Sequence, residues 1–309
     1  MSLELIKKIF ADLPEILECQ IHLLNYNHKK SGTSFNCSIV EFEPNNKTND
    51  IVKELSDIYI NNKLDKFTDV RKYDGTCNES TIYKIEDIFE EYNFDLNTLF
   101  EKIANSNREV NPFDMKAQAY IICGIIENGG TMHQIKLISM NNPITTLKNR
   151  YLIKRGKFKE ITDKVLNLRL LIDVIIYDKT VYILNMSGEK LFNLERAYKL
   201  KCNKDVDDII KMNIISDNNN FKKIATSGYN PRRFVSFNQT RLDYLNDKKQ
   251  RIMVANKYNI ILDKSKDKLL DTSDEKNVEK IIKVLCNKAM WDIFSDDPVE
   301  VDGSKVWNN

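Results

Sequence analysis

Two acid-x-lysine triplets, Asp114-x-Lys116 and Asp247-x-Lys249, are the residues whose types and spacing best suit catalysis. Carboxylates and a lysine spaced in this way hold a divalent metal and activate water in one class of nuclease. Such triplets also arise by chance in a chain with 45 acidic and 47 basic residues. Neither triplet lies on a predicted strand with a well-placed upstream acid, so neither is predicted to be an active site.

The sequence also gives little support for nucleotide binding or for metal binding by histidines. The segment Gly124–Thr131 approaches the phosphate-binding loop G-x-x-x-x-G-K-[ST], but Gly130 stands where the lysine should be. A strand–turn–strand pattern explains these glycines equally well. The histidines, His22, His28 and His133, have no cysteine or carboxylate at metal-ligand spacing. The sequence therefore predicts no catalytic residue, no metal site and no cofactor.

A basic stretch from residue 230 to 259 suits the binding of a polyanion. A helix is predicted to start there, because Asn230 is a good N-cap and Pro231 suits the first helical position. If the helix is continuous, four cations and two aromatic residues share one arc beside an apolar stripe: Arg233, Phe237, Arg241, Tyr244, Lys248 and Arg251. Cations placed in this way neutralise phosphates, and exposed rings stack on unpaired bases. The alternative is an ordinary solvated helix face.

A second basic run, at 148–160, extends this prediction. If the run forms a strand, Lys154, Arg155 and Lys157 would line the same groove as the basic helix. Nothing in either run resembles sequence-specific readout. The two runs together predict a surface that binds DNA without sequence preference.

The charges are segregated along the chain although the net charge is only +2. Residues 1–100 hold 11 bases and 18 acids, whereas residues 101–250 hold 26 bases and 16 acids. This asymmetry is expected when one region meets an anionic partner. The acidic helical stretch 86–103, with Glu86, Glu90, Glu91 and Glu101 outward, is either a solvated face or a dock for the basic loops of a membrane protein.

Grouped strands followed by helices predict an α+β fold, with antiparallel or mixed sheets and a helix-rich C-terminal part. Hairpins are expected at 17–44, 116–140 and 168–186, short strands at 68–72, 81–85 and 258–263, and helices at 49–64, 86–105, through 187–253 and at 274–288. A break in periodicity at 107–114 predicts two domains, an acidic α/β lobe over 1–110 and a basic β-hairpin plus helical lobe over 111–309.

The cysteines and apolar segments bear on cellular location. Six scattered cysteines without a C-x-x-C pair favour free thiols in a reducing cytoplasm. The most apolar run, 168–177, is too short to span a membrane and contains Arg169 and Asp173. We therefore expect a soluble, cytoplasmic protein.

Residues 171–199, "LIDVIIYDKTVYILNMSGEKLFNLERAYK", resemble the strand–turn–strand–helix core of the KwaB-like family. Residues 221–301 resemble that family's closing helices, strand, helix and tail, whereas the first 110 residues follow it only in the order of elements. The family is the soluble component of Kiwa, a bacterial two-component antiphage system. The resemblance implies a cytoplasmic homo-oligomer that binds DNA non-specifically and works with an integral membrane partner, KwaA. It supplies no catalytic residues.

Three functions therefore compete. The leading one is an antiphage effector that binds DNA and acts by occupancy, associated with the membrane through its partner. The second is a metal-dependent nuclease whose acids have no recognisable pattern. The third is a protein–protein adaptor whose basic face meets an acidic partner and does not bind DNA.

Overall fold

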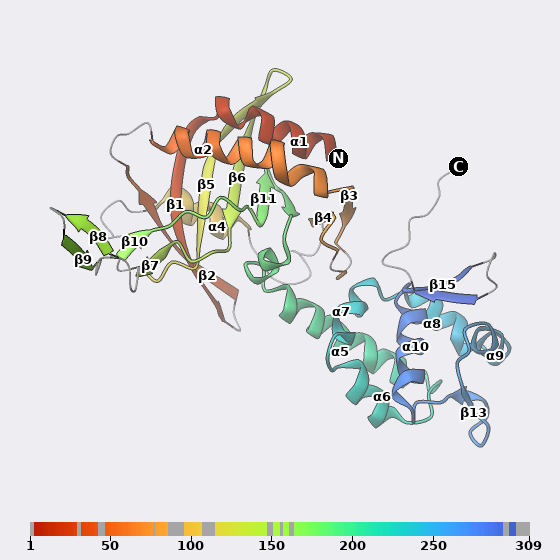
Figure 1. The fold of residues 1–309 in the computed structure, drawn as a ribbon. Helices are drawn as coiled ribbons and strands as arrows, with labels where there is room; N and C mark the ends of the chain where they lie inside the picture. Colours follow the sequence, from red (N-terminus) through yellow and green to blue (C-terminus); the bar gives the residue numbers. More distant parts are fainter. Residues whose placement is uncertain are drawn as a thin grey trace. The chain divides into compact units, whose positions relative to one another are not determined.

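A computed structural model describes residues 3–29, 32–42, 47–73, 75–76, 78–85, 96–106, 115–146, 151–154, 157–160, 164–292 and 297–300. The chain forms two compact units (Figure 1). Unit 1 comprises Met1–Lys72 and Asn78–Asn193, and unit 2 comprises Tyr73–Cys77 and Leu194–Asn309.

Unit 1 is built on an eight-stranded mixed sheet of order β2-β1-β5-β6-β11-β12-β4-β3. The strands are β1 (Leu17–Lys29), β2 (Gly32–Val40), β3 (Asp69–Lys72), β4 (Thr81–Ile85), β5 (Ala119–Asn128), β6 (Thr131–Ser139), β11 (Val174–Tyr177) and β12 (Thr180–Ile183). Only β3 and β4 pair in parallel among these neighbours. The predicted α+β class, with mixed sheets, is confirmed.

The predicted hairpins in this sheet form because their turn residues tolerate positive φ. Gly129 and Gly130 have φ of 62° and 78° and join β5 to β6, as an Asn-Gly-Gly turn permits. Asp178 has a φ of 52° in the turn between β11 and β12. Its carboxylate accepts a hydrogen bond from the Gln134 backbone and contacts His133 Nδ1 at 2.9 Å. The resemblance of 124–131 to a phosphate loop is thus only a hairpin turn.

Helices cover both faces of the sheet, so every residue of a central strand such as β11 is buried. On one face lie α1 (Leu3–Asp12), η1 (Leu13–Glu15) and α2 (Lys47–Ile58), which continues through η2 (Tyr59–Lys63) and η3 (Leu64–Lys66) (Figure 1). The rings of Phe10 and Tyr59 stack at 4.1 Å within that core. The predicted helix at 49–64 is confirmed.

The opposite face of the sheet buries two ionisable side chains beneath α4 (Leu96–Ala104). Lys136 is 7% exposed, and its Nζ lies 4.1 Å from the Phe100 ring centroid. His22 is 1% exposed, with Nδ1 3.1 Å from Ser106 Oγ and no hydrogen-bond partner for Nε2. Burial and, secondarily, the charge of Lys136 lower the pKa of His22 to about 4. His22 is therefore neutral in the folded protein at pH 7.

Smaller elements complete unit 1. β7 (Ile144–Thr146) pairs with β10 (Lys164–Leu166), and β8 (Tyr151–Lys154) pairs with β9 (Lys157–Glu160). The unit ends with η4 (Met186–Lys190), which begins after Asn185, whose side chain accepts a hydrogen bond from the Ser187 backbone. Lys154 and Lys157 occupy paired backbone positions in the β8–β9 register.

Unit 2 packs helices around its own apolar core. They are α5 (Leu194–Lys211), α6 (Asn218–Ala225), α7 (Asn230–Arg233), η5 (Phe234–Ser236), α8 (Gln239–Asn246), α9 (Lys248–Lys257) and α10 (Glu275–Leu285). Two short hairpins, β13 (Leu262–Asp263) with β14 (Leu269–Leu270) and β15 (Ala289–Asp292) with β16 (Asp297–Glu300), accompany them. The helix-rich C-terminal part is confirmed. The strand expected at 258–263 is reduced to β13, and β15–β16 was not predicted.

The sequence predicted a boundary at 110/111, whereas the two compact units separate mainly at 193/194, with Tyr73–Cys77 also in unit 2. The reason is sheet pairing, because β5 pairs with β1 and β12 pairs with β4. Unit 1 consequently holds 25 basic and 26 acidic residues, and unit 2 holds 22 and 19. The strong charge segregation along the sequence thus becomes a small difference between the units, net −1 against +3.

The longest helices of the structure do not suit a bilayer. Within the described ranges, no helix combines the length and the apolar character needed to cross a membrane.

Candidate nucleic-acid interface

The basic stretch after residue 230 is several short helices and not one. The helical conformation is interrupted at Phe237–Asn238 and again at Asp247, where the backbone is extended. The Asn238 side chain accepts a hydrogen bond from the Arg241 backbone, and that of Asp247 from the Gln250 backbone. Each is therefore the N-cap of a new helix, α8 and α9. The predicted continuous helix, with one shared arc of cations, is wrong.

The predicted N-cap is displaced as well. Tyr229 occupies the N-cap position of α7, and Asn230 is the first helical residue. The Asn230 side chain is buried, and its Nδ2 donates to the Ile224 carbonyl at 3.0 Å. Arg233 Nη1 donates to Asn230 Oδ1, and the Arg233 guanidinium lies 5.4 Å from the Tyr229 ring centroid. Arg233 thus contacts its own helix and the preceding turn.

Arg251 does not belong to an exposed cationic surface. The residue is only 5% exposed. Nη1 donates to the carbonyls of Leu245 and Asn246 at 2.9 and 3.2 Å, and Nε donates to the Lys268 carbonyl at 3.1 Å. Arg251 therefore satisfies the last carbonyls of α8, a structural role that the helical projection did not reveal.

Phe237 is also part of the packing of unit 2. Its ring is partly buried, packs against the unit 2 core and stacks on Phe234 with centroids 6.0 Å apart. The structure thus leaves Arg241, Tyr244 and Lys248, of the six residues predicted on the helix, on the accessible part of α8 and α9.

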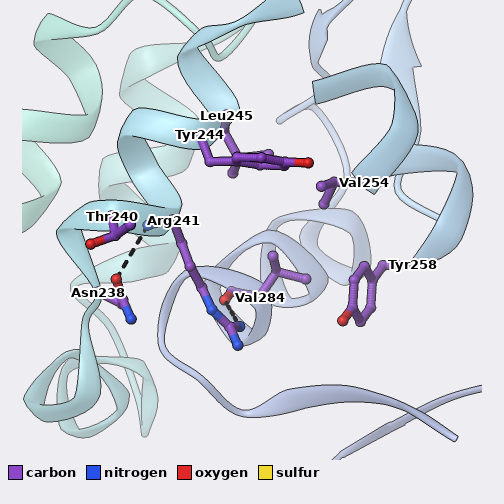
Figure 2. A pocket seen from close by; sticks show the side chains of 8 residues that line it. All are labelled: Asn238, Thr240, Arg241, Tyr244, Leu245, Val254, Tyr258 and Val284. Atoms are coloured by element: carbon purple, nitrogen blue, oxygen red, sulfur yellow. Dashed lines mark hydrogen bonds between the residues drawn. The ribbon is translucent and has the colours of Figure 1, made fainter. Parts of the chain in front are cut away.

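Arg241 and Tyr244 line an open pocket of about 360 Å³ in unit 2. Its wall is formed by residues of α8, α9 and α10 and the residues next to them: Asn238, Thr240, Arg241, Tyr244, Leu245, Val254, Tyr258 and Val284. Figure 2 shows Tyr244 and Tyr258 on two sides of the open space, with Arg241 reaching from α8 toward Val284. Tyr244 is 43% exposed, so its ring is accessible from solvent.

The Arg241 side chain is held by a backbone carbonyl at the C-terminal end of α10. Its Nη1 donates to the Val284 carbonyl at 2.5 Å, within the last turn of that helix. A cation is favourable at a helix C-terminus, where the carbonyls and the helix dipole are negative. A guanidinium has five N–H donors in a rigid fork, so this bond leaves donors for an anion at the pocket.

Two lysines in the first turn of α9 follow Arg241 and Tyr244 along the chain. Lys248 is exposed and forms an ion pair with Asp267, and Lys249 is exposed. Cations in the first turn add to the positive end of the helix dipole, so they do not stabilise α9 itself. The carboxylates of the N-cap Asp247 and of Asp267, which pairs with Lys248, lie at this end of α9, so a phosphate would compete with Asp267 for Lys248.

Sequence reasoning missed Tyr258 as a site residue. We expected a strand from residue 258, whereas Tyr258 is the C-cap of α9. The spacing of Val254 and Tyr258, one helical turn apart, is the signal that would have placed both on one helix face.

The second predicted basic run lies in unit 1. Lys154 and Lys157 pair across β8 and β9, while Arg155 lies outside the described residues. They belong to a different compact unit from Arg241 and Tyr244. The acidic stretch expected to bind a membrane protein is only partly described. Glu86, Glu90 and Glu91 lie outside the described residues, and Glu101 is exposed on α4.

The acid-x-lysine triplets gain no support as a metal centre. Asp247 caps α9, and Asp114 lies outside the described residues. No group of three or more histidine, cysteine or carboxylate side chains that suits a metal occurs in the part of the chain that the structure describes. His28 contacts Thr33 Oγ1 and the Lys190 carbonyl, and His133 contacts Asp178, so both have hydrogen-bonded positions.

A family model described as Kiwa protein KwaB-like matches residues 115–291, more than half of the chain. The chain belongs to the KwaB-like family. Comparisons with curated proteins and with solved structures give no significant match.

The KwaB-like segment contains the whole pocket. It begins just before β5 and ends within β15, so it includes α8, α9 and α10. The family links the chain to Kiwa, a multi-component antiphage defence system. The resemblance in residues 171–199 and in most of 221–301 is thereby confirmed.

Proposed function

We propose that this KwaB-like protein binds DNA without sequence preference through unit 2. The observation that carries the proposal is that Arg241 and Tyr244, two of the predicted contacts, line one open pocket in this unit. Lys248 and Lys249 begin the next helix, and unit 2 holds 22 basic against 19 acidic residues. Cations neutralise phosphates whatever the base sequence, which suits a protein that acts on any invading DNA.

In this proposal, bound protein obstructs the use of phage DNA by occupancy and works with a membrane-embedded Kiwa partner that resembles KwaA. The family supports protein partners because Kiwa has several components. We further propose that the protein is cytoplasmic, that it forms a homo-oligomer, and that the partner brings it to the membrane.

A salt titration tests the DNA contacts. If Arg241, Lys248 and Lys249 each neutralise one phosphate, log K against log salt should have a slope of about −3 on duplex DNA. Reversing Lys248 and Lys249 to glutamate should make the slope shallower by about 2, because two contacts are lost. Fluorescence anisotropy of a labelled duplex, at several salt concentrations, measures both values.

The charge-matched control reverses Lys222 and Lys223 on α6, neither of which lines the pocket. An equal loss of affinity in both double variants would mean that total charge, not this surface, drives binding. If the parent protein binds neither duplex nor single-stranded DNA at low salt, the proposed function is overturned.

A further inference from the structure

The pocket of unit 2 has a shape and chemistry that phosphate binding alone does not use. Leu245, Val254 and Val284 give it apolar walls, and the tyrosine rings of Tyr244 and Tyr258 add flat aromatic surfaces. A phosphate gains nothing from such walls, because it remains hydrated or bonds to polar donors. The pocket is therefore suited to a flat, largely apolar group attached to an anion.

We propose that the pocket takes one unpaired base of single-stranded DNA, stacked on Tyr244 or Tyr258, while the adjacent cations hold the flanking phosphates. The inference rests on the proposed function, which it makes more specific. Aromatic side chains stack on any base, because every base presents a π-face. Arg241 adds a guanidinium that stacks on bases and attracts the strand.

The size of the pocket favours a single base over a folded element. Its volume of about 360 Å³ lies at the lower end of the small-molecule range of roughly 300–1,000 Å³. A protein helix or a DNA duplex is too wide to enter it. Asn238 and Thr240 also lie on the wall: Asn238 Oδ1 caps α8, so the Asn238 amide N–H groups and the Thr240 hydroxyl are the polar groups offered to the edge of a base.

A paired base cannot reach these surfaces. In a duplex both faces of each base are stacked, and extrusion of a base costs a few kcal/mol. Binding of an unpaired base requires no extrusion from a duplex, so this free-energy cost is absent. The pocket should therefore make the protein prefer single strands, although the phosphate contacts are the same for both forms.

Binding of two DNA forms tests the inference. At equal salt, the parent should bind an oligo(dT) strand of about 16 nucleotides roughly 5- to 100-fold more tightly than a duplex of equal length. An abasic strand with the same number of phosphates should lose this advantage. Fluorescence anisotropy gives the three affinities, and quenching of 2-aminopurine in the strand reports stacking directly.

Tyr244→Ala is the first variant, because an exposed ring can be removed without loss of core packing. It should weaken single-strand binding by about 5- to 50-fold and duplex binding by less than about twofold. Tyr258→Leu should act in the same direction, and Tyr258→Phe, which keeps the ring, should retain affinity. Met253→Ala, an exposed α9 residue outside the pocket wall, is the matched control and should change neither.

Two results would overturn the inference and leave the proposed function standing. One is an abasic strand that binds as tightly as oligo(dT). The other is a folded Tyr244→Ala variant with unchanged single-strand affinity, as expected if the pocket takes a side chain of a partner protein. Absence of binding to all three DNA forms would instead overturn the proposed function itself.

Discussion

Replacing Arg251 with methionine should lower the free energy of unfolding by about 3 kcal/mol. The substitution keeps an apolar stem but removes the guanidinium, which donates to the carbonyls of Leu245, Asn246 and Lys268. Arg251 is only 5% exposed, so little water can replace these bonds. Unsatisfied buried carbonyls at the end of α8 then oppose folding. Urea denaturation of the two proteins measures the difference.

Lys249→Met is the matched control, because Lys249 lies on the same helix but is exposed. It should change stability by less than about 0.5 kcal/mol. Arg251→Lys separates charge from geometry, since an ammonium keeps the charge but lacks the fork that reaches all three carbonyls. Arg251→Lys should therefore lower the free energy of unfolding nearly as much as Arg251→Met does. Full stability of either Arg251 variant would contradict the structural role and return this residue to the candidate DNA contacts.

Acidification should destabilise the protein through His22 by about 3 kcal/mol between pH 6.5 and pH 4. Burial, followed by the charge of Lys136, lowers the folded-state pKa of His22 to about 4, below the unfolded value of 6.5. Well above pH 6.5 the ring is neutral in both states and contributes no pH dependence. Below it, the unfolded chain takes up the proton first, so stability falls until the folded protein also binds it near pH 4.

His22→Leu removes this titration. We expect the stability of the parent, relative to the variant, to fall by about 2–3 kcal/mol when urea unfolding is measured at pH 4.5 instead of pH 7. Ser106→Ala is the control, because it removes the contact to His22 Nδ1 but leaves the titrating ring in place. The pH dependence of that variant should match the parent. An imidazole NMR titration of the folded protein with a midpoint near 6.5 would refute the prediction.

Local signals in the sequence were sufficient for most elements. The Asn128-Gly129-Gly130 and Asp178-Lys179 turns lie where the structure has turns, and the helix expected at 274–288 is α10, which the structure caps with Asp274. These features depend on φ preference and on side-chain-to-backbone hydrogen bonds within a few residues. The α+β class followed from the same patterns. The KwaB-like resemblance over the later part of the chain was also present in the sequence.

The division into units could not be read in this way. Which strands pair depends on contacts such as Leu23 with Tyr120 and Val181 with Ile85, which join segments about 100 residues apart. Residues 111–193, assigned from the sequence to the basic lobe, therefore belong to unit 1. The charge contrast along the chain is correspondingly reduced between the folded units.

For the site, the sequence by itself determined which residue types are close along the chain: cations interleaved with aromatic rings from residue 230 to 259. Only the tertiary structure decided which of them are accessible. Asn238 and Asp247 can cap a helix or sit within one, and the packing of unit 2 selects the caps, which breaks the predicted arc. The same packing buries Arg251 against three carbonyls and brings Tyr258 to the pocket that Arg241 and Tyr244 line. A helical projection assumes one straight axis, whereas accessibility depends on where each short helix turns against its neighbours.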